Sequence, residues 1–232
     1  MDKPSAPIIL NGHPHIPYSL ERFTAAEILE KSGHWYEMLD KRRSVRSFST
    51  ESVPKAVIEN LIKTASTAPS GAHRQPWTFC AISDPEMKHK IRVAAEKEEK
   101  ENYEGRMSDR WLKDLAPLAT DWNKPFLDDA PWLIVVFKKV YDWDENGEKQ
   151  NNYYVSESVG IACGMLIAAI HHAGLVTLTH TPSPMNFLEK LLDRPANERA
   201  FLLLPVGYAQ APAYVPDLRR KSLEEVAVFY ER

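Results

Sequence analysis

The sequence contains little cysteine: two residues among 232, Cys80 and Cys163. Both lie inside apolar segments, and neither has an obvious base or metal partner beside it in the sequence. Small proteins of oxidising compartments use more cysteine, in spaced frameworks. We therefore expect two buried, reduced thiols in a reducing compartment, and a disulfide or a reactive thiol is the less favoured alternative.

Long apolar runs are also lacking. The longest are residues 132–137 and 165–170, well short of the ~20 residues that cross a bilayer. The N-terminal residues do not combine a basic stretch with an apolar core, which argues against a secretory signal. We predict a cytoplasmic protein with no membrane attachment.

Charge of one sign is not in excess, since 29 lysines and arginines face 32 aspartates and glutamates, for a net charge of -3. This balance argues against binding to nucleic acid or to a membrane surface. The adjacent His171 and His172 have no third ligand at a metal-binding spacing. We therefore predict no metal site.

What the sequence does contain is a series of helical and strand-like apolar patterns. Capping signals such as Asp84 before Pro85 support the helices. Helices are predicted over residues 24–41, 54–68, from 84 onward, 153–172 and 185–192, with one more turn after Ser222; strands are predicted over 77–82, 132–138, 175–179, 200–206 and 226–230. The irregular spacing of the strands favours an α+β layer fold over a regular βαβ barrel.

The chain is expected to have three parts. Residues 1–23 are rich in proline and histidine and are predicted to form an extended N-terminal arm. Residues 24–218 form the folded domain, and residues 219–232 form a C-terminal extension that we expect to pack on a partner subunit. Within the domain, residues 96–127 are charged, aromatic and weakly periodic. We call residues 96–127 the lid, and we expect it to become ordered only when it packs against another surface.

Glu99, Tyr103 and Lys124 stand out in the lid. Glu99 and Tyr103 are four residues apart, so on a helix they share one face. A carboxylate, a phenol and an ammonium can together bind both charged ends of a zwitterionic amino acid. The alternative is a solvated charged surface, which runs of lysine and glutamate usually form.

Two further segments indicate anion or cofactor binding. Arg42, Arg43 and Arg46 follow the first predicted helix, and arginine presents a planar fork that suits phosphate and carbonyl oxygens. Ser70 and Gly71 belong to a turn with accessible backbone amides, where glycine allows close approach or a positive φ. Taken singly, each segment has a plainer explanation, a basic helix end and an ordinary loop.

Together these segments resemble the nitroreductase superfamily of FMN enzymes, whose members carry an R-R-S-x-R segment followed by an A-P-S segment. The resemblance continues through residues 203–208. It implies a mostly antiparallel sheet flanked by helices, in an intertwined homodimer that holds FMN between its subunits. It also implies FMN contacts from Arg42, Arg43, Ser44, Val45, Arg46, Ser70, Gly71, Thr179, His180, Thr181 and Arg220.

Three segments are similar to the iodotyrosine deiodinase branch of that superfamily: the lid, residues 176–182 and residues 215–221. This resemblance implies reductive removal of halide from halogenated tyrosines. Glu99, Tyr103 and Lys124 would bind the amino and carboxylate groups, and the Ala72 N–H would meet the phenolate oxygen. Animal members begin with a membrane-anchoring segment, and His180 stands where we expect a hydroxyl residue. That histidine either adjusts the reduction potential of the flavin or only packs beside it.

Thr181 is the expected catalytic residue, because a hydroxyl beside flavin N5 favours one-electron steps. The alternative is a loop residue whose hydroxyl satisfies its own backbone.

The sequence has no G-x-G-x-x-G fingerprint, so NADPH would enter the substrate cleft or a separate reductase would deliver electrons. Two other functions stay open: a broad NAD(P)H nitroreductase or quinone reductase, which needs no amino-acid clamp, and a non-catalytic flavin-binding protein.

Overall fold

The computed structural model describes residues 6–18 and 21–231. The chain divides into two units, Met1–Lys41 and Arg42–Arg232, and each is described by itself. The predicted arm, residues 1–23, and the end of the predicted C-terminal extension, residues 219–232, lie partly outside the described residues.

In the first unit, β1 (Ile8–Leu10) and β2 (His13–His15) form an antiparallel hairpin. Asn11 and Gly12 make the turn with φ of 49° and 83°, as the favoured two-residue hairpin turn requires. The described part of the arm is therefore locally a hairpin. Helix α1 (Ala25–Asp40) follows the arm, and a capping box between Thr24 and Glu27 begins it.

The second unit is built on an antiparallel sheet. The strands are β3 (Trp77–Ile82), β4 (Trp132–Lys139), β7 (Val176–Thr177) and β8 (Glu198–Gly207). Their order is β3-β4-β8-β7, and each neighbouring pair is antiparallel. The α+β class and the antiparallel sheet are as the sequence predicts.

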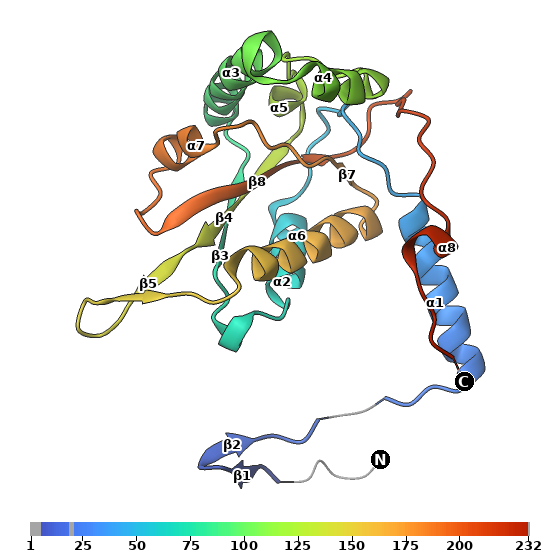
Figure 1. Ribbon diagram of the computed structural model, residues 1–232, viewed down its shortest axis with the longest axis vertical. Coiled ribbons are helices and arrows are strands. Elements are labelled where there is room, and N and C mark those ends of the chain that lie inside the picture. Colours follow the sequence, from blue (N-terminus) through green and yellow to red (C-terminus); the bar gives the residue numbers. More distant parts are fainter. Residues whose placement is uncertain (1–5, 19–20, 232) are drawn as a thin grey trace. The chain divides into compact units, whose positions relative to one another are not determined.

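Helices cover both faces of this sheet (Figure 1). Alternate residues of β4 point to opposite faces, as the pleat requires. Ile134 and Val136 pack with α2 (Lys55–Ser66) and α6 (Val155–His172). Leu133 and Val135 pack with α3 (Pro85–Glu101) and α7 (Asn186–Leu191). Both faces of β4 are therefore buried, which explains why its sequence is continuously apolar.

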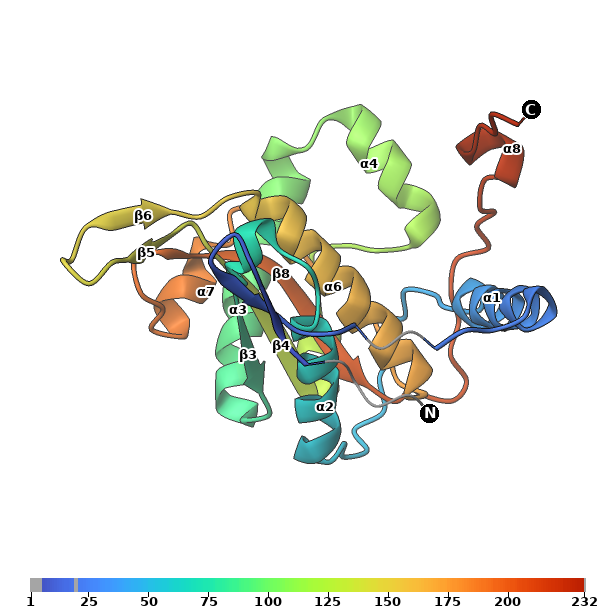
Figure 2. The same cartoon turned by 90° about the horizontal axis from the view of Figure 1, so that it is seen from below.

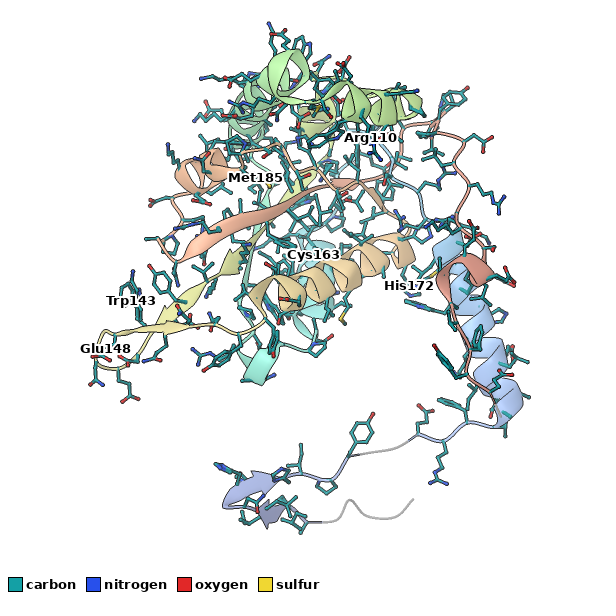
Figure 3. The ribbon with its side chains drawn as sticks, in the orientation of Figure 1. Arg110, Trp143, Glu148, Cys163, His172 and Met185 are labelled. Carbon is teal, nitrogen blue, oxygen red and sulfur yellow. The ribbon has the colours of Figure 1, made fainter. Side chains whose placement is uncertain are left out.

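Helix α6 is long and apolar enough to cross a membrane by length and composition, with a mean hydropathy of 1.3 over its 18 residues. Its inner face nevertheless packs in the core: Val159, Ala162, Cys163 and Leu166 are buried there. Cys163, labelled in Figure 3, belongs to that inner face. Burial raises the pKa of its thiol to about 12, so it is protonated and inert.

The lid is more regular than the sequence suggests. Helix α3 runs into one π-helical turn (Asn102–Arg106), so Glu99 lies on α3 and Tyr103 lies in the π turn. Helix α4 (Asp109–Leu115) then begins at Ser108, whose hydroxyl accepts from the Trp111 amide. A 3-10 turn (Ala116–Leu118) and α5 (Phe126–Asp129) return the chain to β4. In Figure 2, α4 and the chain on either side of it form an open curve beside the sheet.

Two peripheral features differ from prediction. A second hairpin, β5 (Tyr141–Trp143) with β6 (Lys149–Asn151), extends from the end of β4 and was missed. Figure 3 labels Trp143 on β5 and Glu148 at the tip. The C-terminal capping box of Ser222 and Glu225 begins α8 (Leu223–Val226), as predicted. The strand predicted over 226–230 is wrong: Ala227 is extended, but this tail pairs with no strand among the described residues.

Candidate active site

A cavity of about 450 Å³ lies where the segment after α1 meets the C-terminal tail of the second unit. Arginine dominates its wall. The lining residues are Arg42, Arg43, Ser44, Arg46, Leu118, Thr179, Pro216, Leu218, Arg219 and Arg220. Six of the eleven residues predicted to hold FMN are thus brought together from three separate parts of the sequence.

Backbone contacts explain how this wall forms. The Val45 amide donates to the Thr177 carbonyl at 3.2 Å, which attaches residues 42–46 to the edge strand β7. Because the side chains of an extended segment alternate, Val45 is buried while Ser44 and Arg46 line the cavity. Val45 was predicted to contact FMN, and its side chain lies in the interior. Arg220 donates to the Arg42 carbonyl at 2.8 Å, which holds the tail against this segment.

The arginines of this wall lie close enough to affect one another. Burial first, and then the neighbouring Arg220 and Arg43, lower the pKa of Arg42. Burial likewise lowers the pKa of Arg46. Guanidinium groups stay charged in proteins, so this crowding is unfavourable until an anion enters. The donor set fits the phosphate of FMN and the electron-rich edge of its reduced ring.

A second cavity of about 230 Å³ contains the predicted clamp. Glu99, Tyr103 and Lys124 all line it, together with Arg46, Met107, Trp111, Leu115, Thr120, Phe126, Leu178, Thr179, His180 and Thr181. Arg46 and Thr179 line both cavities, so the clamp cavity adjoins the arginine cavity. A ligand in the clamp would therefore lie beside a molecule bound in the larger cavity.

The clamp residues contact one another. Lys124 Nζ lies 3.4 Å from Glu99 Oε2, with side-chain exposures of 5% and 10%. Lys124 Nζ also lies 3.2 Å from Thr120 Oγ1, and it donates to the Asp121 carbonyl. The Tyr103 hydroxyl donates to the Thr120 carbonyl at 3.2 Å. These are desolvated groups rather than members of a solvated charged surface.

Burial alters the acid–base properties of the clamp. It lowers the pKa of Lys124, while the Glu99 carboxylate opposes that shift. It also raises the pKa of Tyr103, so this phenol stays a neutral donor. Both side chains carry donors that can bind a carboxylate.

The segment that follows β7 supplies the remaining predicted residues. His180 exchanges backbone hydrogen bonds with Leu203, 2.9 and 3.1 Å long, so its neighbours Thr179 and Thr181 are held in place at the clamp cavity. The His180 side chain is buried, and its ring stands edge-on to Phe126 at 5.7 Å. Its Nε2 atom has no hydrogen-bond partner among the described residues.

Burial first, and then the cations Lys124 and Arg46, together lower the pKa of His180 to about 3. The imidazole is therefore neutral at the clamp cavity.

The structure does not bring the Ser70 loop to either cavity. Gly71 is needed there for close approach, since a Cβ would lie 2.9 Å from the Tyr153 carbonyl oxygen. The positive φ values belong instead to its neighbours, 48° at Ala72 and 55° at His73. In Figure 1 this loop follows α2, at the opposite end of the unit from α4.

Sequence reasoning missed several residues of the clamp. Thr120 and Phe126 line the cavity, and their sequence context gives no signal of it. Outside this cavity, Lys88 of α3 is buried and donates to the carbonyls of Asp128 at 2.8 Å and Ala130 at 2.7 Å, which attaches α3 to α5. Among the described residues, no group of three or more His, Cys, Asp or Glu side chains is arranged to hold a metal ion.

Known proteins are similar to this chain in sequence and in fold. Residues 39–208 match the sequence model of the nitroreductase family. The iodotyrosine deiodinase of Haliscomenobacter hydrossis is 62% identical, over 93% of this chain and 97% of its own. Iodotyrosine deiodinase 1 of Homo sapiens is 52% identical, over 92% of this chain and 74% of its own.

A solved structure of oxidised iodotyrosine deiodinase bound to FMN and 3-iodo-L-tyrosine superposes with a TM-score of 0.72 at 34% identity, covering 85% of this chain and 99% of that one. The match to the family model and the identities above show the family to which the chain belongs. The chain belongs to the nitroreductase family and, within it, to the branch of the iodotyrosine deiodinases.

Proposed function

We propose that this protein is an FMN-dependent oxidoreductase that removes halide reductively from halogenated tyrosines. One observation carries the proposal: a buried Lys124–Glu99 pair lies in a cavity that shares Arg46 and Thr179 with an arginine-lined cavity. The carbon–halogen bond breaks, two electrons and a proton enter, and tyrosine and halide leave. Relatives that carry the name iodotyrosine deiodinase at 50–62% identity support this reaction.

The substrate would be held by its amino-acid end. Glu99 would accept from the ammonium group, while Lys124 and the Tyr103 hydroxyl would donate to the carboxylate. In the structure Glu99 and Lys124 neutralise each other across 3.4 Å. A zwitterion offers each of them a partner of opposite charge, so it can bind without leaving a buried charge unpaired.

FMN would occupy the arginine cavity, and when bound it supplies the electrons. Arg42, Arg43, Arg46 and Arg220 would neutralise its phosphate and its reduced ring. The remaining predicted contacts are Ser44, Val45 (through its backbone), Ser70, Gly71, Thr179, His180 and Thr181. NADPH or a separate reductase would in turn reduce the flavin.

A homodimer would complete the site. The loop of residues 70–72 lies apart from both cavities, so we propose that this loop of one subunit meets the cavities of the other. The Ala72 N–H would then donate to the phenolate oxygen of the substrate. Exposed apolar residues support an interface: Ile161 on α6 is 47% exposed, and Val228 and Phe229 in the tail are 76% and 68% exposed.

We further propose that the dimer is cytoplasmic, without attachment to a membrane or to nucleic acid.

Titration of the oxidised, FMN-loaded protein with 3-iodotyrosine and with tyrosine tests the function, with flavin absorbance or fluorescence as the readout. Saturable binding of 3-iodotyrosine, release of iodide on reduction, and much weaker binding of tyrosine are expected. Reduction of nitroaromatics without recognition of any halotyrosine would favour the broad nitroreductase. A bound flavin that turns over with no substrate would favour the non-catalytic flavoprotein.

A further inference from the structure

Lys124 is attached to α3 at two points. Its side chain meets Glu99, and its backbone amide donates to Glu96 Oε1 at 2.8 Å. Glu96 and Glu99 are three residues apart on α3, so they lie on neighbouring positions of one helix face. One rigid helix therefore contacts both the backbone and the ammonium group of the same lysine.

Arg92 holds Glu96 in place. Its Nε donates to the same Glu96 Oε1 at 2.7 Å, and its Nη1 lies 2.9 Å from Asp128 Oδ2. Its Nη2 donates to Asn123 Oδ1 at 3.0 Å. The pKa of Arg92 is raised, and its hydrogen bond with Glu96 contributes most to that rise. Arg92 thus attaches Asn123, the residue before Lys124, and Asp128 of α5 to α3.

This network surrounds a segment with little regular structure of its own. Residues 119–125 connect the 3-10 turn to α5. A lysine side chain is flexible and loses much rotamer freedom when it is fixed. Its ammonium can point at a ligand only if the backbone that carries it is held, and Glu96 accepts from that backbone. Glu96 itself is not among the residues that line the clamp cavity in the described chain.

We propose that Glu96, oriented by Arg92, is a positioning residue that fixes Lys124 for recognition of the substrate carboxylate. The inference rests on the proposed function, because it assumes that Lys124 binds that carboxylate. An ordinary i, i+4 ion pair between Arg92 and Glu96 at a surface would contribute little. The added acceptor role toward the Lys124 amide is what links this pair to affinity for the ligand.

The test measures dissociation constants of the FMN-loaded protein for 3-iodotyrosine and for 2-iodophenol, which lacks the amino-acid end. Glu96→Ala should weaken 3-iodotyrosine binding about tenfold, since one hydrogen bond to a charged acceptor is lost, and should barely change 2-iodophenol binding. Glu96→Gln keeps an oxygen that can accept from the Lys124 amide, so it should restore most of the affinity. Glu86→Ala is the matched control, because Glu86 lies on the same helix and pairs only weakly with Lys90, at 3.9 Å.

A double-mutant cycle separates positioning from general damage to the lid. In a Lys124→Ala background, Glu96→Ala should weaken 3-iodotyrosine binding little further, because the group it positions is already gone. Additive losses, or equal losses for both ligands, would overturn the inference. If Lys124→Ala weakens binding while Glu96→Ala behaves like the parent, this inference fails and the proposed function stands. If the parent binds no 3-iodotyrosine, or Lys124→Ala has no effect, the proposed function fails.

Discussion

The ammonium nitrogen of Lys124 lies 3.4 Å from Oε2 of Glu99, and both side chains are at least nine-tenths buried. Removing one member of such a pair leaves an uncompensated buried charge, which is far more costly than losing a solvated ion pair. A ligand with both charges exchanges one ion pair for two. A ligand with one charge, or none, cannot do so. We therefore expect the pair to select zwitterions.

The clamp can be tested by removing each partner. Lys124→Ala, Glu99→Gln and Tyr103→Phe should each weaken halotyrosine binding while FMN stays bound. The cost for a desolvated charge contact is on the order of 2–5 kcal/mol, or roughly thirtyfold and more in dissociation constant. Titration of the flavin signal measures it. Lys90→Ala, which removes an exposed lysine of α3, is the control, and halotyrosine affinities equal to the parent in all three variants would refute the assignment.

His180 should make the protein less stable in acid. Its pKa is about 3 in the folded protein against an ordinary 6.5. Between these values the unfolded chain binds a proton that the folded chain does not, so stability falls as the pH drops below about 6.5. Each pKa unit corresponds to about 1.4 kcal/mol. The facing groups are Lys124, Arg46 and the Phe126 ring, with Glu99 and Tyr103 on the same cavity.

Urea unfolding of the FMN-loaded protein at pH 7.5, 6 and 5 measures this effect. The parent should lose more stability over this range than His180→Gln, which cannot take up a proton. His13→Gln removes an exposed histidine and should follow the parent. Parallel pH dependences for the parent and His180→Gln would show that His180 does not titrate in this way.

The substrate should bind as its phenolate. A halogen ortho to the hydroxyl lowers the phenol pKa below the ~10 of tyrosine, and a backbone amide at Ala72 suits an anionic oxygen. Affinity should therefore rise with pH up to the phenol pKa of each ligand and then level off. Binding titrations of chloro-, bromo- and iodotyrosine against pH provide the measurement. An affinity that follows halogen size and ignores pH would contradict phenolate binding.

Local signals predicted much of the fold. The continuous apolar run of β4 and the Asp84–Pro85 helix start both have short-range causes, and both are confirmed. The two hairpins were missed although each carries an Asn-Gly turn, at Asn11–Gly12 and Asn146–Gly147. That dipeptide is a strong hairpin signal, but each flanking strand has only three residues, too few to establish an alternating pattern.

The site was less accessible to sequence reasoning, because its contacts join distant segments. The clamp residues are confirmed as neighbours in space, yet nothing local to Glu96 or Arg92 indicates that they hold the backbone around Lys124. A glutamate four residues after an arginine usually indicates a solvated helix face. The loop of residues 70–72 poses a different problem, since its predicted role depends on a second copy of the chain.

Thr181 should be required for dehalogenation and not for flavin binding. It lines the clamp cavity beside Thr179 and His180, in a segment held by the backbone bonds between His180 and Leu203. A hydroxyl at that position can donate to flavin N5 and favour one-electron steps. Thr181→Ala should lower the dehalogenation rate about a hundredfold, the loss typical of one preorganised donor, while nitroaromatic reduction and FMN content change little. Thr64→Ala, which removes a hydroxyl bonded within α2, is the control. If Thr181→Ala slows both reactions equally, its hydroxyl serves the backbone alone and the catalytic role must be withdrawn.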